Sequence, residues 1–196
     1  MENEKITCHG CGVAVSSNIS QCEYCGNPIQ IRSFRSVAGM SPQLLNKYIQ
    51  SYQKDLSAQP NNSDSKIAIA FCYLQLKLYD KAIEVFIKEA ESNLNNSEVL
   101  FYAAISLLKG KKAFLAQRTD IDKMLEYLVA ATIIEDKPIF RYVLAYIKYD
   151  FFHRKGYKIN PNYEHEYKAA LDGGVTDLDI KELHELLSVE RPVVFG

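Results

Sequence analysis

Hydrophobic and polar residues follow a helical rhythm through most of this chain. From Leu44 to Leu187, apolar residues recur every three to four positions in segments of about 12 to 18 residues. Short polar stretches rich in Gly, Pro, Asn and Asp separate the segments and predict helix ends. We place these breaks at Pro60–Asp64, Leu78–Asp80, Asn93–Ser97, Gly110–Asp120, Glu135–Pro138, Gly156–Asn162 and Gly173–Thr176.

The same pattern predicts the organisation of the chain. No alternating strand pattern occurs beyond the first 30 residues, so we expect a mainly α fold, a short array of about seven or eight helices with a small N-terminal β module. Ser, Gly and Pro interrupt the periodicity after that module. The predicted parts are the β module at 1–30, a linker at 31–42, a helical domain with a capping helix at 43–190, and an apolar tail at 191–196.

Four of the five cysteines form two C-x-x-C-G pairs, Cys8 with Cys11 and Cys22 with Cys25. The ten residues from 12 to 21 separate the pairs, a spacing that places four thiolates on two opposed turns. Such a set suits one tetrahedral Zn²⁺, with sulfur about 2.3 Å from the metal. Because four sulfurs complete the coordination shell, we predict a structural zinc ribbon. A segment this short cannot bury a core, so metal binding must supply its folding free energy.

Other roles for these cysteines fit less well. Disulfides need an oxidising compartment, whereas this chain begins without an apolar signal stretch and carries an unpaired Cys72. A redox C-x-x-C would accompany a strand–helix–strand unit, which the pattern does not predict here. His9 lies inside the first turn, and we expect it to face solvent. Cys72 lies in mid-helix among apolar neighbours, where a buried, inert thiol is expected.

Charge and composition narrow the function. Lys and Arg number 23 against 24 Asp and Glu in 196 residues, a net charge of −1, which favours neither nucleic acid nor an anionic membrane as a partner. No apolar run approaches the ~20 residues that a membrane-spanning helix needs. We therefore expect a cytoplasmic protein. Its histidines are scattered, and recognised catalytic and nucleotide-binding motifs are missing, so we do not predict an enzyme.

A period near 34 residues indicates a repeat. The stretch Ser63–Asn96 resembles the tetratricopeptide repeat (TPR), a helix–turn–helix unit of that length. The resemblance covers roughly residues 43 to 172, with an insertion at Lys109–Thr119 in its second full unit. The residues that carry it are Ala70, Tyr73, Ala82 and Phe86.

The resemblance implies a concave face lined by the first helix of each unit, where peptides bind in that family. The nine positions that correspond to this groove are all apolar or aromatic, and each triplet has the i, i+4, i+7 spacing of one helical face. They are Ile67, Phe71, Leu74, Phe101, Ile105, Leu108, Tyr142, Tyr146 and Tyr149. Nine such side chains left in water would favour aggregation. Two interpretations follow: the capping helix or tail fills the groove, or a partner segment docks there.

Two further segments leave alternatives open. The insertion, with four cations between Lys109 and Arg118, fits a solvated helix end and loop, or a contact with a partner or an anionic surface. The apolar tail 191–196 fits docking on its own domain, or a strand-like ligand for another protein. Together these features predict a non-enzymatic adaptor that binds a protein or peptide through its helical array. The alternative is a nucleic-acid-associated regulatory factor that uses the zinc ribbon.

Overall fold

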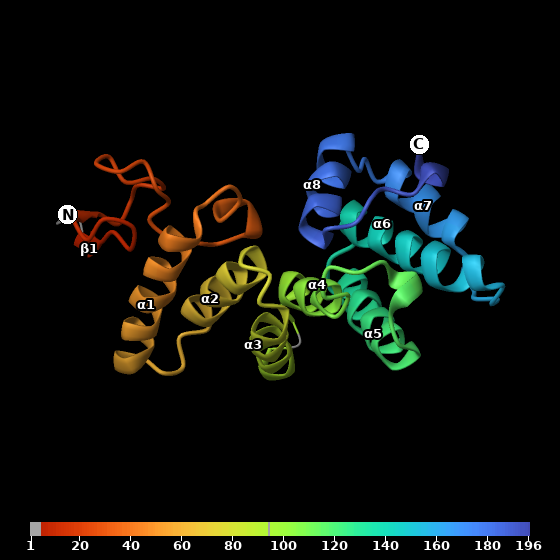
Figure 1. Cartoon of the computed structure of the whole chain (residues 1–196), viewed down its shortest axis with the longest axis horizontal. Helices are drawn as coiled ribbons and strands as arrows, with labels where there is room; N and C mark the ends of the chain where they lie inside the picture. The colour runs from red at the N-terminus through yellow and green to blue at the C-terminus, as the bar shows by residue number, and fades with distance from the viewer. Residues whose placement is uncertain (1–4, 94) are drawn as a thin grey trace. The chain divides into compact units, whose positions relative to one another are not determined.

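A computed structural model describes residues 5–93 and 95–196 of the chain. The described residues contain eight α-helices and one two-stranded sheet, so the mainly α prediction is confirmed (Figure 1). The chain forms two compact units, an N-terminal unit of residues 1–85 and a C-terminal unit of residues 86–196. In this division, residues 31–42 and the first helices share a unit with the β module. The predicted domain bounds stay a prediction.

The helices begin and end close to the predicted breaks. Their bounds are α1 Pro42–Ala58, α2 Ser63–Gln75, α3 Tyr79–Ser92, α4 Ser97–Ser106, α5 Arg118–Ile134, α6 Pro138–Ile147, α7 Tyr163–Asp172 and α8 Asp177–Leu187. Asparagine side chains just before α2, α4 and α7 accept a hydrogen bond from the first turn of the helix. Thr176 and Asp179 form a reciprocal capping box at the start of α8.

The β module consists of β1, Lys5–Thr7, paired antiparallel with β2, Ala14–Ser16. In this register Ile6 lies opposite Val15. The buried core of the module is limited to Cys8, Val15, Cys22 and Ile29. Two of these four residues are cysteines, so apolar packing contributes little here and the sulfur cluster forms the centre of the module.

The segment predicted as a linker is packed rather than extended. A short 3-10 helix, η1, spans Phe34–Ser36, and both Ile31 and Val37 are buried. Beyond it α1 packs against α2. The ribbon, this segment and the first helices therefore fold as one body, the N-terminal unit.

In the C-terminal unit, helices that follow one another along the chain pack together. Helix α4 contacts α5, α6 contacts both α5 and α7, and α8 contacts α6. The stacked rings of Phe101 and Phe140, 4.7 Å apart, join α4 to α6. These contacts form a helical core that includes the first helices of the second and third repeat units.

A five-residue π-helix, η3, continues α6 over Lys148–Phe152. It places two side chains of opposite charge, Lys148 and Asp150, in the interior. The Lys148 ammonium lies 2.6 Å from a carboxylate oxygen of Glu166 on α7. Arg154 pairs with Asp150 at 2.5 Å. Each buried charge thus has an opposite partner, the condition under which burial of a charge is tolerated.

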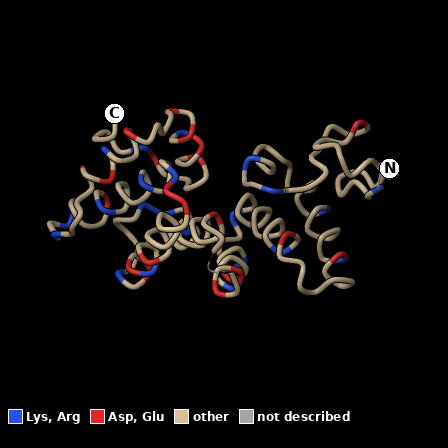
Figure 2. Tube along the Cα trace, turned by 180° about the vertical axis from the view of Figure 1, so that it is seen from behind, with Lys and Arg blue, Asp and Glu red and all other residues tan. Residues whose placement is uncertain are grey.

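Charged residues of both signs are interspersed along the trace in each unit (Figure 2). Across residues 5–93 and 95–196, none of the helices combines the length and the apolar composition needed to cross a membrane.

Candidate metal centre and helical groove

The four paired cysteines meet in one cluster. Their sulfur atoms all lie within 4.8 Å of one another, and this cluster can hold a metal ion. The closest contacts run between the two pairs, 3.8 Å from Cys8 to Cys25 and 3.7 Å from Cys11 to Cys22. The two C-x-x-C turns therefore face each other, as their spacing predicts.

The local sequence explains how each turn forms. The residue after each pair is a glycine in the left-handed region, with φ 81° at Gly12 and 70° at Gly26. The amide of Gly12 donates to the carbonyl of Cys8 at 2.8 Å, and the amide of Gly26 makes the same bond to Cys22. A residue with a side chain would be strained at either position. The two glycines thus close the turns that present the sulfurs.

Backbone amides also tune the thiols. Burial raises the pKa of Cys22, but hydrogen bonds from the amides of Tyr24 and Cys25 outweigh it and lower that pKa to about 7. At Cys8 burial dominates and raises the pKa to about 12. A metal ion must therefore displace the proton from Cys8, whereas Cys22 ionises readily near neutral pH.

The prediction that His9 faces solvent is wrong. Its side chain is only 14% exposed, and its Nδ1 lies 2.6 Å from the hydroxyl oxygen of Ser51 on α1. The ring also packs on Tyr52, with 4.3 Å between centroids, and its Nε2 lies 3.8 Å from Asp55. Sequence patterns missed this role because Ser51 lies 42 positions along the chain. His9 fastens the first cysteine turn to α1.

Two buried tyrosines of α1 complete this junction. The Tyr48 hydroxyl donates to the carbonyl oxygen of Pro28 at 2.5 Å, beside the second cysteine turn. The Tyr52 hydroxyl accepts from the amide of Ile31 at 2.9 Å. Both contacts use backbone groups, so they fix the path of the chain as it leaves the ribbon. The metal centre is therefore held by α1 on two sides.

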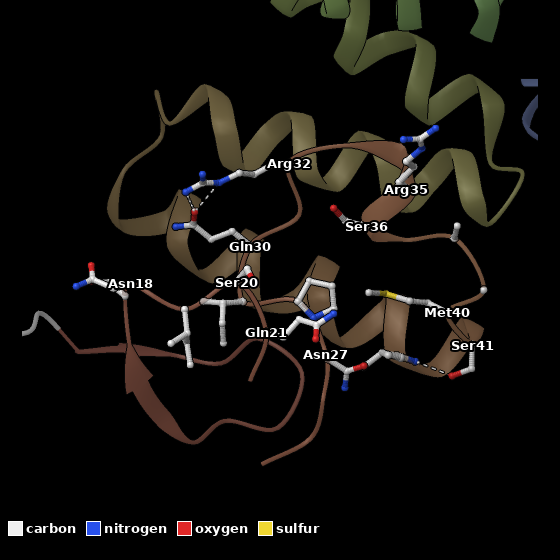
Figure 3. Close-up of a pocket in the computed structure, with 17 residues that line it drawn as sticks. Asn18, Ser20, Gln21, Asn27, Gln30, Arg32, Arg35, Ser36, Met40 and Ser41 are labelled. Carbon is white, nitrogen blue, oxygen red and sulfur yellow. Dashed lines mark hydrogen bonds between the residues drawn. The ribbon is translucent and has the colours of Figure 1, made fainter. Parts of the chain in front are cut away.

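A polar cavity of about 800 Å³ lies between the ribbon and the packed segment before α1 (Figure 3). Amide and hydroxyl side chains such as Asn27 and Ser36 line it together with Arg32 and Arg35, and among residues 5–93 and 95–196 no acidic side chain lines it. The guanidinium of Arg32 donates to the side-chain oxygen of Gln30 at 2.6 Å. The cavity thus carries cationic and neutral polar groups.

The nine predicted groove positions lie mostly in the interior. Ile67 and Tyr149 are partly exposed. The remaining seven are buried: Phe71, Leu74, Phe101, Ile105, Leu108, Tyr142 and Tyr146. In this conformation, the buried positions are not available to a partner.

The capping helix and the tail cover the groove positions of α6 and η3. His184 of α8 hydrogen-bonds the Tyr142 hydroxyl through Nε2 at 2.9 Å and packs edge-on against Tyr146. Phe195 of the tail lies 5.5 Å from the rings of both Tyr142 and Tyr149. At this end of the array, the chain covers its own groove positions with α8 and the tail.

The insertion is also folded onto the C-terminal unit. It forms a short 3-10 helix, η2, at Ala113–Leu115, which contacts η3. The amide of Phe114 donates to a carboxylate oxygen of Asp150 at 2.7 Å, and the guanidinium of Arg154 stacks over the Phe114 ring. The insertion is therefore not only a solvated loop, because part of it packs against η3. Sequence analysis missed Asp150, because an acid inside an apolar helical stretch gave no sign of its partner.

Cys72 lies apart from the metal cluster and is buried, as predicted. Burial raises the pKa of its thiol to about 12, so the thiolate is scarce near neutral pH. This residue is an inert part of the core.

Comparison with known proteins supports the fold. Neither a protein-family model nor a curated protein sequence matches the chain. Among solved structures, "MamA AMB-1 P212121" is similar with a TM-score of 0.51 and 20% identity, over 81% of this chain and 75% of that one. "MamA MSR-1 C2" gives 0.48 and 18%, over 70% and 69%. At such identities the likeness concerns the fold alone.

These findings define the class of protein. The chain has a TPR-like helical fold, the fold of MamA, joined to a four-cysteine module that can hold a metal ion.

Proposed function

We propose that the chain is a non-enzymatic adaptor that binds a segment of another protein through its helical array. The observation that carries this proposal is the apolar face of α6 and η3, which in this structure accommodates the tail, whose residues Val193–Phe195 form a short 3-10 helix, η5. A surface that holds one apolar segment has the shape and chemistry to hold another. The ribbon, fastened to α1, supplies a second rigid surface at the other end of the chain.

We assign Zn²⁺ to the cysteine cluster. Four sulfurs at about 2.3 Å from a tetrahedrally bound ion lie about 3.8 Å from one another. The two contacts between the cysteine pairs, 3.7 and 3.8 Å, agree with this value. Four thiolates also form the ligand set that structural zinc prefers. Because they fill the coordination shell, the ion would stabilise the ribbon rather than bind a substrate.

The test is affinity capture from nuclease-treated extract of the native host, with the two partly exposed groove positions changed. We expect the variants Ile67→Glu and Tyr149→Glu to lose partners that the unmodified chain retains, because a charge in the groove must be desolvated when an apolar segment binds. Substitutions at the buried Phe71 or Tyr146 would disturb the fold itself, so they are unsuitable.

The matched control is Ile133→Glu, which changes an apolar residue of α5 that is 79% exposed and lies outside the groove positions. All three variants should keep the helical circular dichroism of the unmodified chain. If every partner survives both groove variants, the adaptor proposal fails. A partner whose binding instead weakens steeply with salt in the presence of nucleic acid would favour the nucleic-acid role.

A further inference from the structure

We propose that a box of four tyrosines in the C-terminal unit is a recognition site for an aromatic side chain and the main-chain carbonyl beside it. The tyrosine box consists of Tyr142, Tyr149, Tyr163 and Tyr167. Its occupant in this structure is Phe195, the last residue of η5, and the partner segment we infer is a peptide that carries phenylalanine and, four residues before it, an arginine, as the tail does. This inference rests on the adaptor role proposed above and names the chemistry of its ligand.

Three successive elements build the tyrosine box. Tyr142 lies in α6 and Tyr149, seven residues later, in η3, while Tyr163 and Tyr167 lie one turn apart in α7. The ring centroid of Phe195 lies 5.5 Å from the centroids of Tyr142 and Tyr149. It lies 6.3 Å from that of Tyr163 and 4.8 Å from that of Tyr167. These are the separations at which aromatic rings attract one another in edge-on and tilted arrangements. Phe195 is fully buried among them.

The site also binds the backbone of its occupant. The Tyr167 hydroxyl donates to the carbonyl oxygen of Phe195 at 2.6 Å, and a guanidinium nitrogen of Arg191 donates to the same oxygen. Arg191 is held in turn by Asp177 at 2.9 Å, at the start of α8. The site thus supplies one donor to this carbonyl, Tyr167, and the arginine of the bound segment supplies the other, which fixes the position of a ligand as well as the side chain that enters the box.

Phe195 is the tail residue whose ring enters the box, and Arg191 adds the ion pair with Asp177. Val193 is 96% exposed and Val194 is also exposed, so these two residues contribute little burial. A partner segment that places its own phenylalanine in the box, and makes further contacts, can therefore compete with the tail.

Space adjoins the occupied position. A cavity of about 490 Å³ lies beside Phe195. Its wall includes the apolar side chains of Leu171, Val175 and Ile180 together with the charged Asp177 and Arg191. The site thus has room for a segment that extends further than the tail does.

The experiment measures binding of a fluorescein-labelled peptide, Arg-Pro-Val-Val-Phe-Gly, to the purified full-length chain by fluorescence anisotropy. The variant Phe195→Ala empties the box, and Val193→Ala is its control, because it shortens an exposed residue of the same tail. We expect Phe195→Ala to bind the peptide at least about tenfold more tightly than the unmodified chain and Val193→Ala. A peptide with alanine in place of phenylalanine should bind at least about tenfold more weakly.

A second measurement guards against loss of structure in Phe195→Ala. The chain contains no tryptophan, so Phe195→Trp and Val193→Trp each create a single indole emitter. We expect blue-shifted emission from Phe195→Trp and red-shifted emission from Val193→Trp. Saturating unlabelled peptide should shift the first toward red and leave the second unchanged.

Several results would overturn the proposal. Equal affinity of Phe195→Ala and the unmodified chain would do so, as would equal affinity for the two peptides. Concentration-dependent dimerisation of the unmodified chain that Phe195→Ala abolishes would assign the box to the tail of a second copy instead. The peptide measurements use purified components and test only the tyrosine box. If they fail, the captured partners can still support the adaptor role. If capture fails, the peptide measurements can still support the tyrosine box.

Discussion

The two units of the chain are stabilised by different means. In the N-terminal unit the ribbon has a core of four residues, two of them cysteines of the candidate metal centre, and it is fastened to α1 by polar contacts. In the C-terminal unit the helices bury large aromatic side chains and paired charges, and the tail closes the remaining apolar face. Under the zinc assignment proposed above, the ribbon would depend on an ion from outside the chain, whereas the C-terminal unit completes its core with its own residues.

This difference predicts which substitutions should destabilise each unit most. Loss of one sulfur removes a bond to the metal and with it most of the cohesion of the ribbon. Loss of one side chain in the C-terminal unit removes one of many contacts, so its cost depends on whether a charge is left without a partner.

The largest effect should follow from Cys22→Ser. Metal binding contributes roughly 10–16 kcal/mol to the folding of comparable zinc peptides, so a three-sulfur site should leave the ribbon unfolded. We expect near-stoichiometric zinc in the unmodified chain and a large loss of zinc in the variant, measured by elemental analysis. The control is Cys72→Ala, which removes a buried cysteine outside the cluster and should retain the metal. Equal zinc contents in the two variants would refute the assigned ligands.

Within the C-terminal unit, Glu166→Gln should have the largest effect. This change leaves the Lys148 ammonium buried without its carboxylate, a situation that costs about 3–5 kcal/mol in comparable proteins. The control is Glu126→Gln, which breaks an exposed pair with Lys123 and should cost less than about 1 kcal/mol. Urea denaturation followed by circular dichroism measures both. Similar midpoints for the two variants would show that the buried pair does not hold α6 and α7 together.

A smaller effect should follow from His9→Ala, which detaches the first cysteine turn from α1. The variant loses one hydrogen bond and two ring contacts, with Tyr52 and Tyr48, together about 1–2 kcal/mol. We expect faster amide hydrogen exchange in α1, by about five- to thirtyfold, with the metal still bound. The exposed His165 provides the control, because His165→Ala leaves this junction untouched. Unchanged exchange in α1 would mean that the tyrosines alone hold the ribbon.

The smallest effect concerns pH and His184. Burial lowers the pKa of this histidine, and the charge of Arg191 lowers it further, although a hydrogen bond to the backbone at Val189 opposes them. The unfolded chain therefore binds the proton more readily than the folded chain does. This contribution to stability is present above pH ~6.5 and is lost as pH falls through the pKa of the folded state.

We expect the unmodified chain to lose more stability than His184→Asn as pH falls from ~7.5 to ~5. Thermal unfolding of the two proteins at each pH measures this difference. The other histidines, His9 included, are the same in both proteins, so their contributions cancel in the comparison. Parallel pH profiles would contradict the assignment.

Sequence patterns predicted the parts of this molecule that depend on near neighbours. The cysteine cluster followed from spacing, because a tetrahedral ion accepts few arrangements of four sulfurs. Helix ends followed from capping residues, as at Thr176. Both are local rules that a single sequence displays in full.

The parts that escaped prediction depend on contacts between distant residues. His9 meets Ser51 across 42 positions, and Phe114 meets Asp150 across 36. Likewise, the groove residues could be identified as apolar, but their cover could not, because Phe195 reaches Tyr142 only after α7 and α8 have turned the chain back. Pairings of this kind depend on the tertiary fold rather than on local preference.

The π-helix of η3 has a consequence for how the third repeat can vary in length. A single π turn accommodates one residue more than an α-helix of the same rise, so it is equivalent to an insertion inside a helix. That extra residue lets Lys148 and Asp150 both point inward, one toward α7 and the other toward the insertion. Removal of one residue here would return the segment to α-helical geometry, while the turns before and after it keep their phase. Lys148 and Asp150 could then no longer both point inward, so the length of this turn, rather than any single contact, decides which charges the core has to pair.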